Sequence, residues 1–413
     1  MNNLTRRTNC RLCGGDNFDH VLPIRASAIG DAFVSADRLH EKQGVYPLDL
    51  YLCLTCGHLQ NLDIVNPEIM FRDYTYRTSV SLGLVEHFRE YAADTVKRLG
   101  IARGSLVVEI GSNDGTLLKA FKELGMKVVG VDPARNIAHE ATASGVPTLP
   151  EYFSSAIAKN ILSEHGQARL ICANNVFAHI DEMSDVVKGI HKLLASDGVF
   201  VFEVSYVPDI IDSFVFDTVY HEHVSHHAII PLERFFQTQR MSLFDVIRVR
   251  TKGGSIRGFA QKISEGLRLR TSAIDELIRT ETTRGITRPE IYRNFFSEIE
   301  KRKRALDELL DDCERRGLLV AGFGASTTTT TLVYHFELGK RLSFIVDDNP
   351  KKHYQYSPGN HIPVLPSEEL YVRRPDYVVI LAWIYADAIV RRHKRFIEEG
   401  GKFVIPLPDL KIV

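Results

Sequence analysis

One stretch of the sequence combines a predicted buried strand with glycines that could bring the backbone close to a ligand. The apolar run around Glu109 predicts a strand covered on both faces, and Gly111 and Gly115 then turn the chain into a helix that begins near Thr116. Only one residue separates Glu109 from the first glycine, whereas in the dinucleotide-binding fingerprint three glycines receive a pyrophosphate. The stretch therefore favours a ligand without phosphate.

Two further strand ends carry polar side chains that suit such a ligand. The strand predicted over 127–131 ends in Asp132, 23 residues after Glu109, where a carboxylate can bind the two hydroxyls of an adenosine ribose. A later strand, 169–173, leads to Asn174, whose amide can bond the amino acid or adenine portion of a cofactor. Strand, Glu-x-Gly-x-Asn-x-Gly, helix, strand and Asp together resemble S-adenosylmethionine-dependent methyltransferases. We therefore expect S-adenosylmethionine to be bound by Glu109, Gly111, Asn113, Gly115, Asp132 and Asn174. The alternative is a doubly wound domain that has no cofactor or holds another nucleotide.

Four of the six cysteines form two Cys-x-x-Cys pairs. Cys10 and Cys13 make the first pair, Cys53 and Cys56 make the second, and a glycine after each pair permits the turn of a short knuckle. In a chain with no export signal this spacing indicates a metal before a disulfide. Four thiolates complete the tetrahedral coordination of zinc, so we expect a structural ion with no open position for a substrate. A redox pair or a disulfide would leave the second pair unexplained, and His58 is interpreted as an incidental neighbour.

The segment 220–227 is unusually rich in titratable groups, with four histidines, one carboxylate and one tyrosine in eight residues. Such density is typical of functional sites. Histidines two positions apart could bind a metal, with Glu222 assisting. However, the pairing spacings on a helix are three or four, and on a strand alternate residues leave the coordination sphere incomplete. Acid–base chemistry beside the methyl donor is the favoured interpretation.

Two more segments leave their interpretation open. His179 follows the strand that ends at Asn174, and it is either a substrate contact or a solvated loop histidine. The segment 67–85, which contains Tyr76, is rich in aromatic and hydroxyl side chains and has no clear period. It is either a lid that carries tyrosines into the site or a packed connection between domains.

The elements that must position these residues alternate between strand and helix over 106–204, which predicts a parallel sheet with helices on both faces. Ligands in such sheets bind beyond the carboxyl ends of the strands. An antiparallel hairpin over 243–261 and a long helix with apolar residues from Phe295 to Leu310 follow. We predict an α/β protein with three parts: a small zinc-binding lobe (1–70), a central Rossmann-like methyltransferase domain (71–265), and a helical connection with a second Rossmann-like domain (266–413).

The second α/β unit begins with a strand that leads into Gly322-x-Gly324 and Ser326. Free amides at the helix start after Ser326 could attract phosphate oxygens, and the five threonines that follow supply small hydroxyls there. The unit could instead be a degenerate duplicate of the central domain that only shapes the cleft.

Length and composition limit the classes of protein to consider. The chain has 413 residues, 44% of them hydrophobic, which is enough for two or three separately cored domains. Its net charge of −1 argues against a nucleic-acid surface. The sequence contains no run that resembles a signal peptide or a membrane span, so we expect a cytoplasmic protein without membrane contacts. Separately, we expect the protein to be a monomer.

Taken in order, these pieces resemble the three-domain sugar C-methyltransferases. The similarity rests on the cysteine knuckles, Glu-Ile-Gly-Ser-Asn-Asp-Gly, Tyr-His-Glu-His, Lys-Gly-Gly-Ser-Ile-Arg and Gly-Phe-Gly-Ala-Ser, and it spans nearly the whole chain. The resemblance implies methylation at C3 of a 4-keto-deoxysugar linked to a nucleoside diphosphate, with the sugar between the central and C-terminal domains. The family's functional positions fall on His223, Glu222, Tyr220, Tyr76 and His179, and we expect Arg257, Gly324 and Ser326 to bind the substrate.

The chemistry of this reaction assigns a role to each group. A ring carbon becomes nucleophilic once it loses a proton to a base, and an adjacent ketone delocalises the charge as an enolate. We expect His223 to be that base, Glu222 to orient it or hold a sugar hydroxyl, and Tyr220, Tyr76 and His179 to donate to the developing oxyanion. The alternatives are an O- or N-methyltransferase of another small metabolite, and a module in which the cysteine knuckles contact a protein or nucleic acid.

Overall fold

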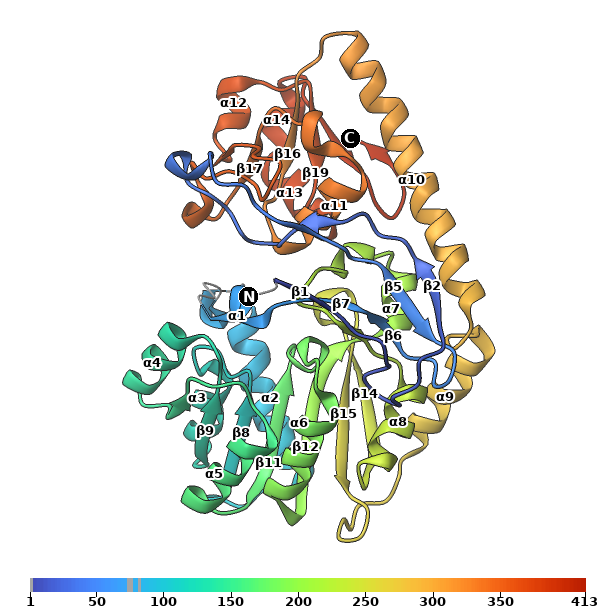
Figure 1. The fold of residues 1–413 in the computed structure, drawn as a ribbon. Coiled ribbons are helices and arrows are strands. Elements are labelled where there is room, and N and C mark those ends of the chain that lie inside the picture. The colour runs from blue at the N-terminus through green and yellow to red at the C-terminus, as the bar shows by residue number, and fades with distance from the viewer. Residues whose placement is uncertain (1–2, 73–76, 81–82) are drawn as a thin grey trace.

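The computed structural model describes residues 3–72, 77–80 and 83–413. Two α/β domains lie at opposite ends of the molecule, and the N-terminal segment crosses the space between them (Figure 1). The long helix α10 (Pro289–Arg315) runs along one side and joins the central domain to the C-terminal domain. At about 1.5 Å per residue, its 27 residues span roughly 40 Å. The predicted mixed α/β class is confirmed.

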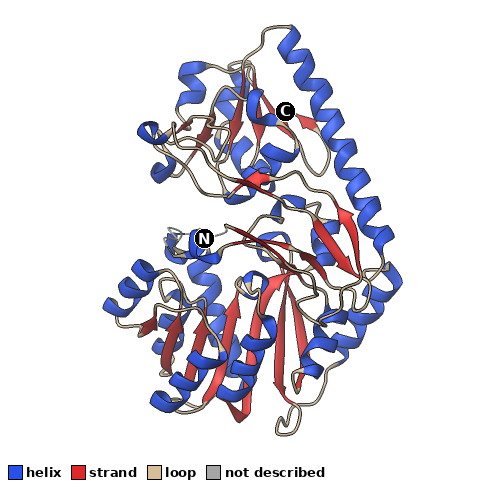
Figure 2. Ribbon diagram, in the orientation of Figure 1, coloured by secondary structure: helices blue, strands red, loops and turns tan. Residues whose placement is uncertain are grey.

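The central domain contains one twisted sheet with helices on its two faces (Figure 2). Its seven strands lie in the order β10-β9-β8-β11-β12-β15-β14, and the first five run parallel. The strand order reverses at β8, so the loops after β8 and β11 open a crevice for a ligand. The strands are β8 (Leu106–Ile110), β9 (Lys127–Val131), β10 (Thr148–Leu149), β11 (Ala168–Asn174), β12 (Leu194–Ser205), β14 (Met241–Val249) and β15 (Ser255–Lys262).

The hairpin formed by β14 and β15 completes this sheet at one edge, with β15 antiparallel to both β12 and β14. The central strands β8 and β11 are almost wholly buried, because helices cover both faces of the sheet there. The helices of this domain are α2 (Leu84–Leu99), α3 (Thr116–Glu123), α4 (Arg135–Ala143), α5 (Ser155–His165), α6 (Met183–Leu193), α7 (Val207–Asp212) and α8 (Ile229–Thr238).

The C-terminal domain repeats the same plan on a smaller scale. Its sheet has the order β18-β17-β16-β19-β20-β21, parallel except for the last strand, and the order reverses at β16. Its elements are β16 (Val320–Phe323), α11 (Thr327–His335), β17 (Ile345–Asp347), β18 (Val364–Pro366), α12 (Glu369–Arg373), β19 (Tyr377–Ile380), α13 (Ala386–Arg392), α14 (Lys394–Glu398), β20 (Lys402–Ile405) and β21 (Lys411–Ile412). Helix α9 (Ser272–Arg284) precedes α10.

The N-terminal lobe is built on a four-stranded antiparallel sheet to which the central domain contributes one strand. Strands β2 (Phe18–Leu22), β5 (Leu50–Cys53) and β6 (Leu59–Asn61) pair in sequence, and β13 (Ser225–His226) adds to the edge of β6. Two short pairs, β1 (Leu4–Arg6) with β7 (Asp63–Val65) and β3 (Ser27–Ala28) with β4 (Val45–Tyr46), flank it. Helix α1 (Pro67–Phe71) ends the lobe.

One apolar core joins all three parts. It contains Leu50 from the lobe, Phe216 from the central domain, Phe295 from α10 and Leu332 from α11. The parts therefore pack against each other as a protein interior does. Among the described residues, the structure shows no helix with the length and apolar character of a membrane span.

Candidate active site

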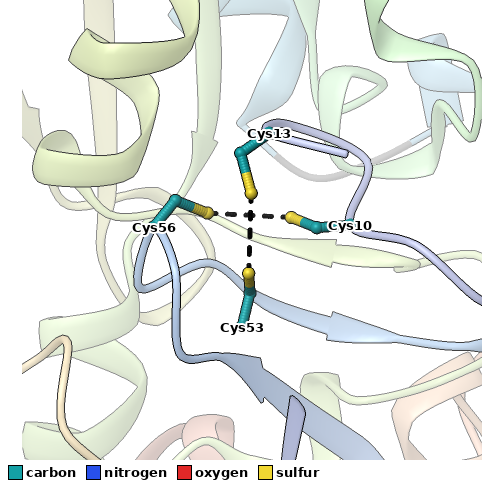
Figure 3. A group of neighbouring side chains, drawn as sticks. All are labelled: Cys10, Cys13, Cys53 and Cys56. Atoms are coloured by element: carbon teal, nitrogen blue, oxygen red, sulfur yellow. Dashed lines mark hydrogen bonds between the residues drawn. The ribbon is translucent and has the colours of Figure 1, made fainter. Parts of the chain in front are cut away.

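The four predicted zinc ligands converge at one point of the lobe. Their sulfur atoms point toward a common centre (Figure 3), and all lie within 4.8 Å of one another. The distances from Cys10 Sγ to Cys56 Sγ and from Cys13 Sγ to Cys53 Sγ are 3.7 and 3.6 Å. A zinc ion with Zn–S bonds of about 2.3 Å in a tetrahedron requires sulfur atoms about 3.8 Å apart, so the arrangement fits the ion.

Neighbouring groups orient these thiolates. Gln60 Nε2 donates to Cys10 Sγ at 3.1 Å, and the Gly15 amide donates to Cys13 Sγ at 3.4 Å. Donors of this kind fix the ligands and stabilise the negative charge on sulfur. With four sulfurs around the centre, no position remains for a substrate, and the zinc site is structural.

A cavity of about 620 Å³ lies where the carboxyl ends of both parallel sheets face each other. The loops after β8, β9 and β11 line it from the central domain, and the start of α11 and the loop after β19 line it from the C-terminal domain. The structure brings together here many of the residues predicted for the site: Glu109, Gly111, Asn113, Asp132, Asn174, His179, Tyr220, Glu222, His223 and Ser326.

Asp132 and Asn113 shape the wall of this cavity that the central domain provides. The Asp132 carboxylate accepts hydrogen bonds from the Asn113 amide at 2.8 Å and from the Ala134 amide at 2.9 Å. These bonds tie the turn after β8 to the turn after β9. Gly111 and Gly115 adopt φ values of +69° and +74°, which glycine reaches without strain. Gly115 begins α3 and lies outside the cavity lining, whereas a Cβ at Gly111 would come within 2.7 Å of Val176.

Several buried polar atoms on this wall lack hydrogen-bond partners among the described residues. Glu109 Oε2 and both amide atoms of Asn174 are buried in this way. Burial, followed by the charges of Asp132 and Asp114, raises the pKa of Glu109 well above its ordinary value. Because unpartnered buried polar atoms are costly, they are suited to a ligand that carries complementary groups. S-adenosylmethionine fits, since its ammonium and sulfonium charges complement a carboxylate and its amino acid portion can bond an amide.

His223 is held by two hydrogen bonds at the opposite wall. Its Nδ1 lies 2.7 Å from the carbonyl oxygen of Thr218, and its Nε2 lies 2.9 Å from the hydroxyl of Tyr220. A carbonyl can only accept, so Nδ1 carries a hydrogen and Nε2 of the neutral ring has the lone pair. The two rings lie close, with centroids 4.1 Å apart. The geometry therefore leaves Nε2 as the basic atom.

His179 lies beside His223, with ring centroids 5.1 Å apart, and its ring also stacks on that of Phe71 of α1 at 5.7 Å. The loop after β11 and the lobe therefore meet at the histidine-rich segment. Glu222 is buried next to His223 and also lines the cavity. Tyr76 lies outside the described residues.

The residues that flank β13 explain how the histidine-rich segment is placed. The Asn61 amide donates to the Val224 carbonyl at 3.1 Å, and His58 Nε2 lies 3.1 Å from Ser225 Oγ. His58 is wholly buried and is not a member of the cysteine cluster, which agrees with its interpretation as a neighbour of the zinc site and not a ligand. The zinc lobe holds one end of the histidine-rich segment. Among the described residues, the four cysteines form the only cluster with metal-ligand geometry, and no metal group forms around His223.

The C-terminal wall carries Ser326 at the N-terminus of α11, where its hydroxyl lies 3.1 Å from Thr329 Oγ1 in a capping box. Thr327 and Thr328 line the cavity beside it. Gly324 contributes in another way: its φ is +102°, and a Cβ there would come within 2.5 Å of Ala382. Gly324 thus lets β16 and β19 end close together and does not itself line the cavity.

Arg257 does not lie with the other predicted substrate residues. Its buried guanidinium donates to Glu203 at 2.9 and 3.0 Å and sits 4.0 Å from the ring centroid of Tyr91. His87 Nε2 contacts the same carboxylate at 3.1 Å. With its donors directed at Glu203 inside the sheet, Arg257 stabilises the domain and is not part of the cavity lining.

Comparison with known proteins adds to this geometry. Residues 10–71 match a zinc-binding domain family, 84–245 a methyltransferase domain family, and 250–408 the C-methyltransferase C-terminal domain family. The chain is 33% identical over 405 residues to C-methyltransferase NovU of Streptomyces niveus, covering 98% of this chain and 96% of that protein.

Similar solved structures include magnesium protoporphyrin IX methyltransferase ChlM of Synechocystis with bound SAH. It is 15% identical with a TM-score of 0.35 over 44% of this chain and 84% of that chain. The CcbJ methyltransferase of Streptomyces caelestis is 14% identical with a TM-score of 0.35, over 42% and 89% of the two chains.

The cavity at the strand ends and the matching domains define a methyltransferase that uses S-adenosylmethionine and carries a structural zinc site. More narrowly, the full-length similarity shows that the chain belongs to the three-domain, zinc-containing C-methyltransferases. The predicted cofactors and enzyme class are confirmed.

Proposed function

We propose that the enzyme methylates C3 of a 4-keto-deoxysugar linked to a nucleoside diphosphate. The observation that carries the proposal is His223 at the cavity wall, with Nδ1 bonded to a carbonyl and Nε2 left basic. Methyl transfer to oxygen or nitrogen does not require a carbon acid to be deprotonated. Transfer to carbon beside a ketone does, and an oriented neutral imidazole suits that task.

The proposed reaction has two steps, deprotonation of C3 and transfer of the methyl group to it. His223 Nε2 takes the proton from C3, and the electron pair of the broken C–H bond moves to the C4 oxygen. The enolate carbon then forms a bond to a methyl carbon while the bond from that carbon to sulfur breaks. S-Adenosylmethionine supplies this methyl group, which its sulfonium charge makes electrophilic.

Hydrogen-bond donors near the base stabilise the charge on the C4 oxygen. Tyr220 donates to His223 Nε2 in this structure, so its hydroxyl marks the side from which the C3 proton would arrive. Once substrate takes that place, the hydroxyl can turn to the oxyanion. His179, next to His223, and Tyr76 are proposed as further donors, and Glu222 as the group that holds a sugar hydroxyl.

The two sides of the cavity suit the two ligands. Glu109, Asp132 and Asn174 would hold the cofactor in the central domain, because their buried oxygens and amide face the cavity there. The sugar would lie between this wall and α11. Ser326 is retained as a substrate contact at the start of α11, whereas Arg257 is not retained, since Glu203 occupies its guanidinium.

A solvent-exchange experiment tests the proposal. The protein is incubated with candidate 4-keto-deoxysugar nucleotides in deuterated water, with and without S-adenosylmethionine, and mass and proton spectra are followed. Deuterium at C3 without the cofactor and a carbon-bound methyl with it are expected. Methyl transfer to oxygen or nitrogen of any acceptor, without exchange at carbon, would contradict the enolate mechanism.

A further inference from the structure

Three consecutive residues shortly before His223 in the sequence, Asp217, Thr218 and Val219, each accept a hydrogen bond. Asp217 Oδ2 accepts from Trp383 Nε1 at 3.0 Å, the Thr218 carbonyl accepts from His223 Nδ1 at 2.7 Å, and the Val219 carbonyl accepts from Thr331 Oγ1 at 2.7 Å. The bond to His223 therefore lies between two others.

Both outer bonds come from the C-terminal domain. Trp383 belongs to the loop after β19, and Thr331 lies in α11, so separate elements hold the two sides of the Thr218 peptide. Asp217 and Thr331 are each 1% exposed and Trp383 is 7% exposed. Water does not compete for these bonds. Loss of the Thr331 hydroxyl would remove the hydrogen bond that the buried Val219 carbonyl accepts, whereas Asp217 also receives one from Thr328.

We infer that Trp383 and Thr331 are positioning residues for His223. They hold the 217–219 segment so that the Thr218 carbonyl keeps the hydrogen on Nδ1 and leaves Nε2 basic toward the cavity. The inference rests on the proposed role of His223 as the base. The C-terminal domain would thus support the proton transfer, although none of its own groups accepts the proton.

The physical reason lies in the tautomer. If the Thr218 carbonyl turned away, the hydrogen of the neutral ring could move to Nε2, and a ring nitrogen that carries hydrogen cannot accept another from carbon. A small displacement of a positioned group is also enough to slow a reaction strongly. The hydrogen bonds from Trp383 and Thr331 restrict both the rotation of the Thr218 carbonyl and the displacement of His223.

Substitutions at Thr331 and Trp383 test whether these side chains position His223. Thr331→Val removes the hydroxyl that bonds Val219 and should lower kcat about tenfold, as expected for one lost buried hydrogen bond. The KM of the acceptor and the affinity for S-adenosylhomocysteine should stay unchanged. Thr331→Ser keeps the hydroxyl and should restore kcat to within about twofold of the wild type. Trp383→Phe should lower kcat and also raise the acceptor KM, because Ile384 and Tyr385 beside it line the cavity.

The matched control is Thr330→Val, one position along α11. Thr330 is also buried, but among the residues that the structure describes its side chain forms no hydrogen bond with the 217–219 segment. Its kcat should equal that of the wild type. Nitrogen-15 spectra of labelled histidine, with His223 assigned through His223→Gln, should show hydrogen on Nδ1 in the wild type and a mixed tautomer in Thr331→Val.

Two results would overturn the inference: wild-type kcat in both Thr331→Val and Trp383→Phe, or a lowered kcat with an unchanged His223 tautomer. Failure of the proposed function looks different. In that case His223→Gln itself would retain turnover, whatever the Thr331 variants do.

Discussion

His223 Nδ1 lies 2.7 Å from the carbonyl oxygen of Thr218, and this contact decides which ring nitrogen can act as a base. The partner is a backbone atom on the short turn Phe216–Thr218, immediately before the histidine-rich segment. Local chain geometry thus sets the tautomer, and the surrounding domains fix that geometry.

Removing the imidazole of His223 should abolish most of the turnover and leave cofactor binding intact. His223→Ala should lower kcat by about 10² to 10⁴, the range attributed to positioned acid–base groups. Calorimetry with S-adenosylhomocysteine should give a wild-type Kd, because the residues proposed to hold the cofactor lie on the opposite wall. The exposed His165 provides a control, and His165→Ala should keep full activity. Wild-type turnover in His223→Ala would remove this residue from the mechanism.

The carboxylate of Asp132 should be essential for cofactor affinity. Its two oxygens accept the Asn113 and Ala134 amides, and in Asp132→Asn one of these amides would face an NH₂ group. We expect the Kd for S-adenosylhomocysteine to rise at least tenfold, equivalent to about 1.4 kcal/mol, measured by calorimetry.

The C-terminal domain offers a matched control for this experiment. Asp347 ends β17 and accepts the Ala325 amide at 2.6 Å, much as Asp132 accepts Asn113. Asp347→Asn should leave the Kd for S-adenosylhomocysteine unchanged. A loss of cofactor affinity in Asp347→Asn equal to that in Asp132→Asn would show that the central domain is not the sole cofactor site.

Loss of one zinc ligand should destabilise both the N-terminal lobe and the segment of the central domain that pairs with it. Cys53→Ser removes one of the four sulfurs, and because β6 of the lobe pairs with β13, the histidine-rich segment loses support as well. We expect no bound zinc by elemental analysis, lower soluble yield and a lower melting temperature. Cys313→Ser changes a buried cysteine of α10 outside the cluster and should keep one zinc per chain. A metal-free, soluble and fully active Cys53→Ser protein would contradict the structural role.

Sequence patterns were sufficient for the α/β class and for placing several of the predicted residues together at the cavity. Both depend on local signals, namely apolar runs that become buried strands and polar residues placed directly after them, as at Asp132 and Asn174. Patterns failed where the partner is distant. Arg257 was expected to bind the substrate, yet its charge pairs with Glu203 on the neighbouring strand. The contacts of Thr218 and Val219 use carbonyl oxygens, which every residue has, so no sequence signal could reveal them.

The buried carboxyl of Asp217 should make the stability of the protein depend on pH. Burial raises its pKa to about 7, and hydrogen bonds from Trp383 and Thr328 only partly oppose the shift. The ordinary value in an unfolded chain is about 3.9. Because the folded state holds this proton more tightly, the contribution of Asp217 to the free energy of unfolding falls as pH rises from about 4 to 7.

Asp217→Asn removes this titration and keeps an oxygen that can accept from Trp383. The variant should gain stability relative to the wild type as pH rises through that window, by up to about 4 kcal/mol, and the gain should level off above pH 7. Urea unfolding at several pH values measures it. The exposed carboxylate of Asp387 is the control, and Asp387→Asn should show no such trend. A stability difference between Asp217→Asn and the wild type that stays constant from pH 5 to about 8 would mean that Asp217 is charged throughout this range in the folded protein.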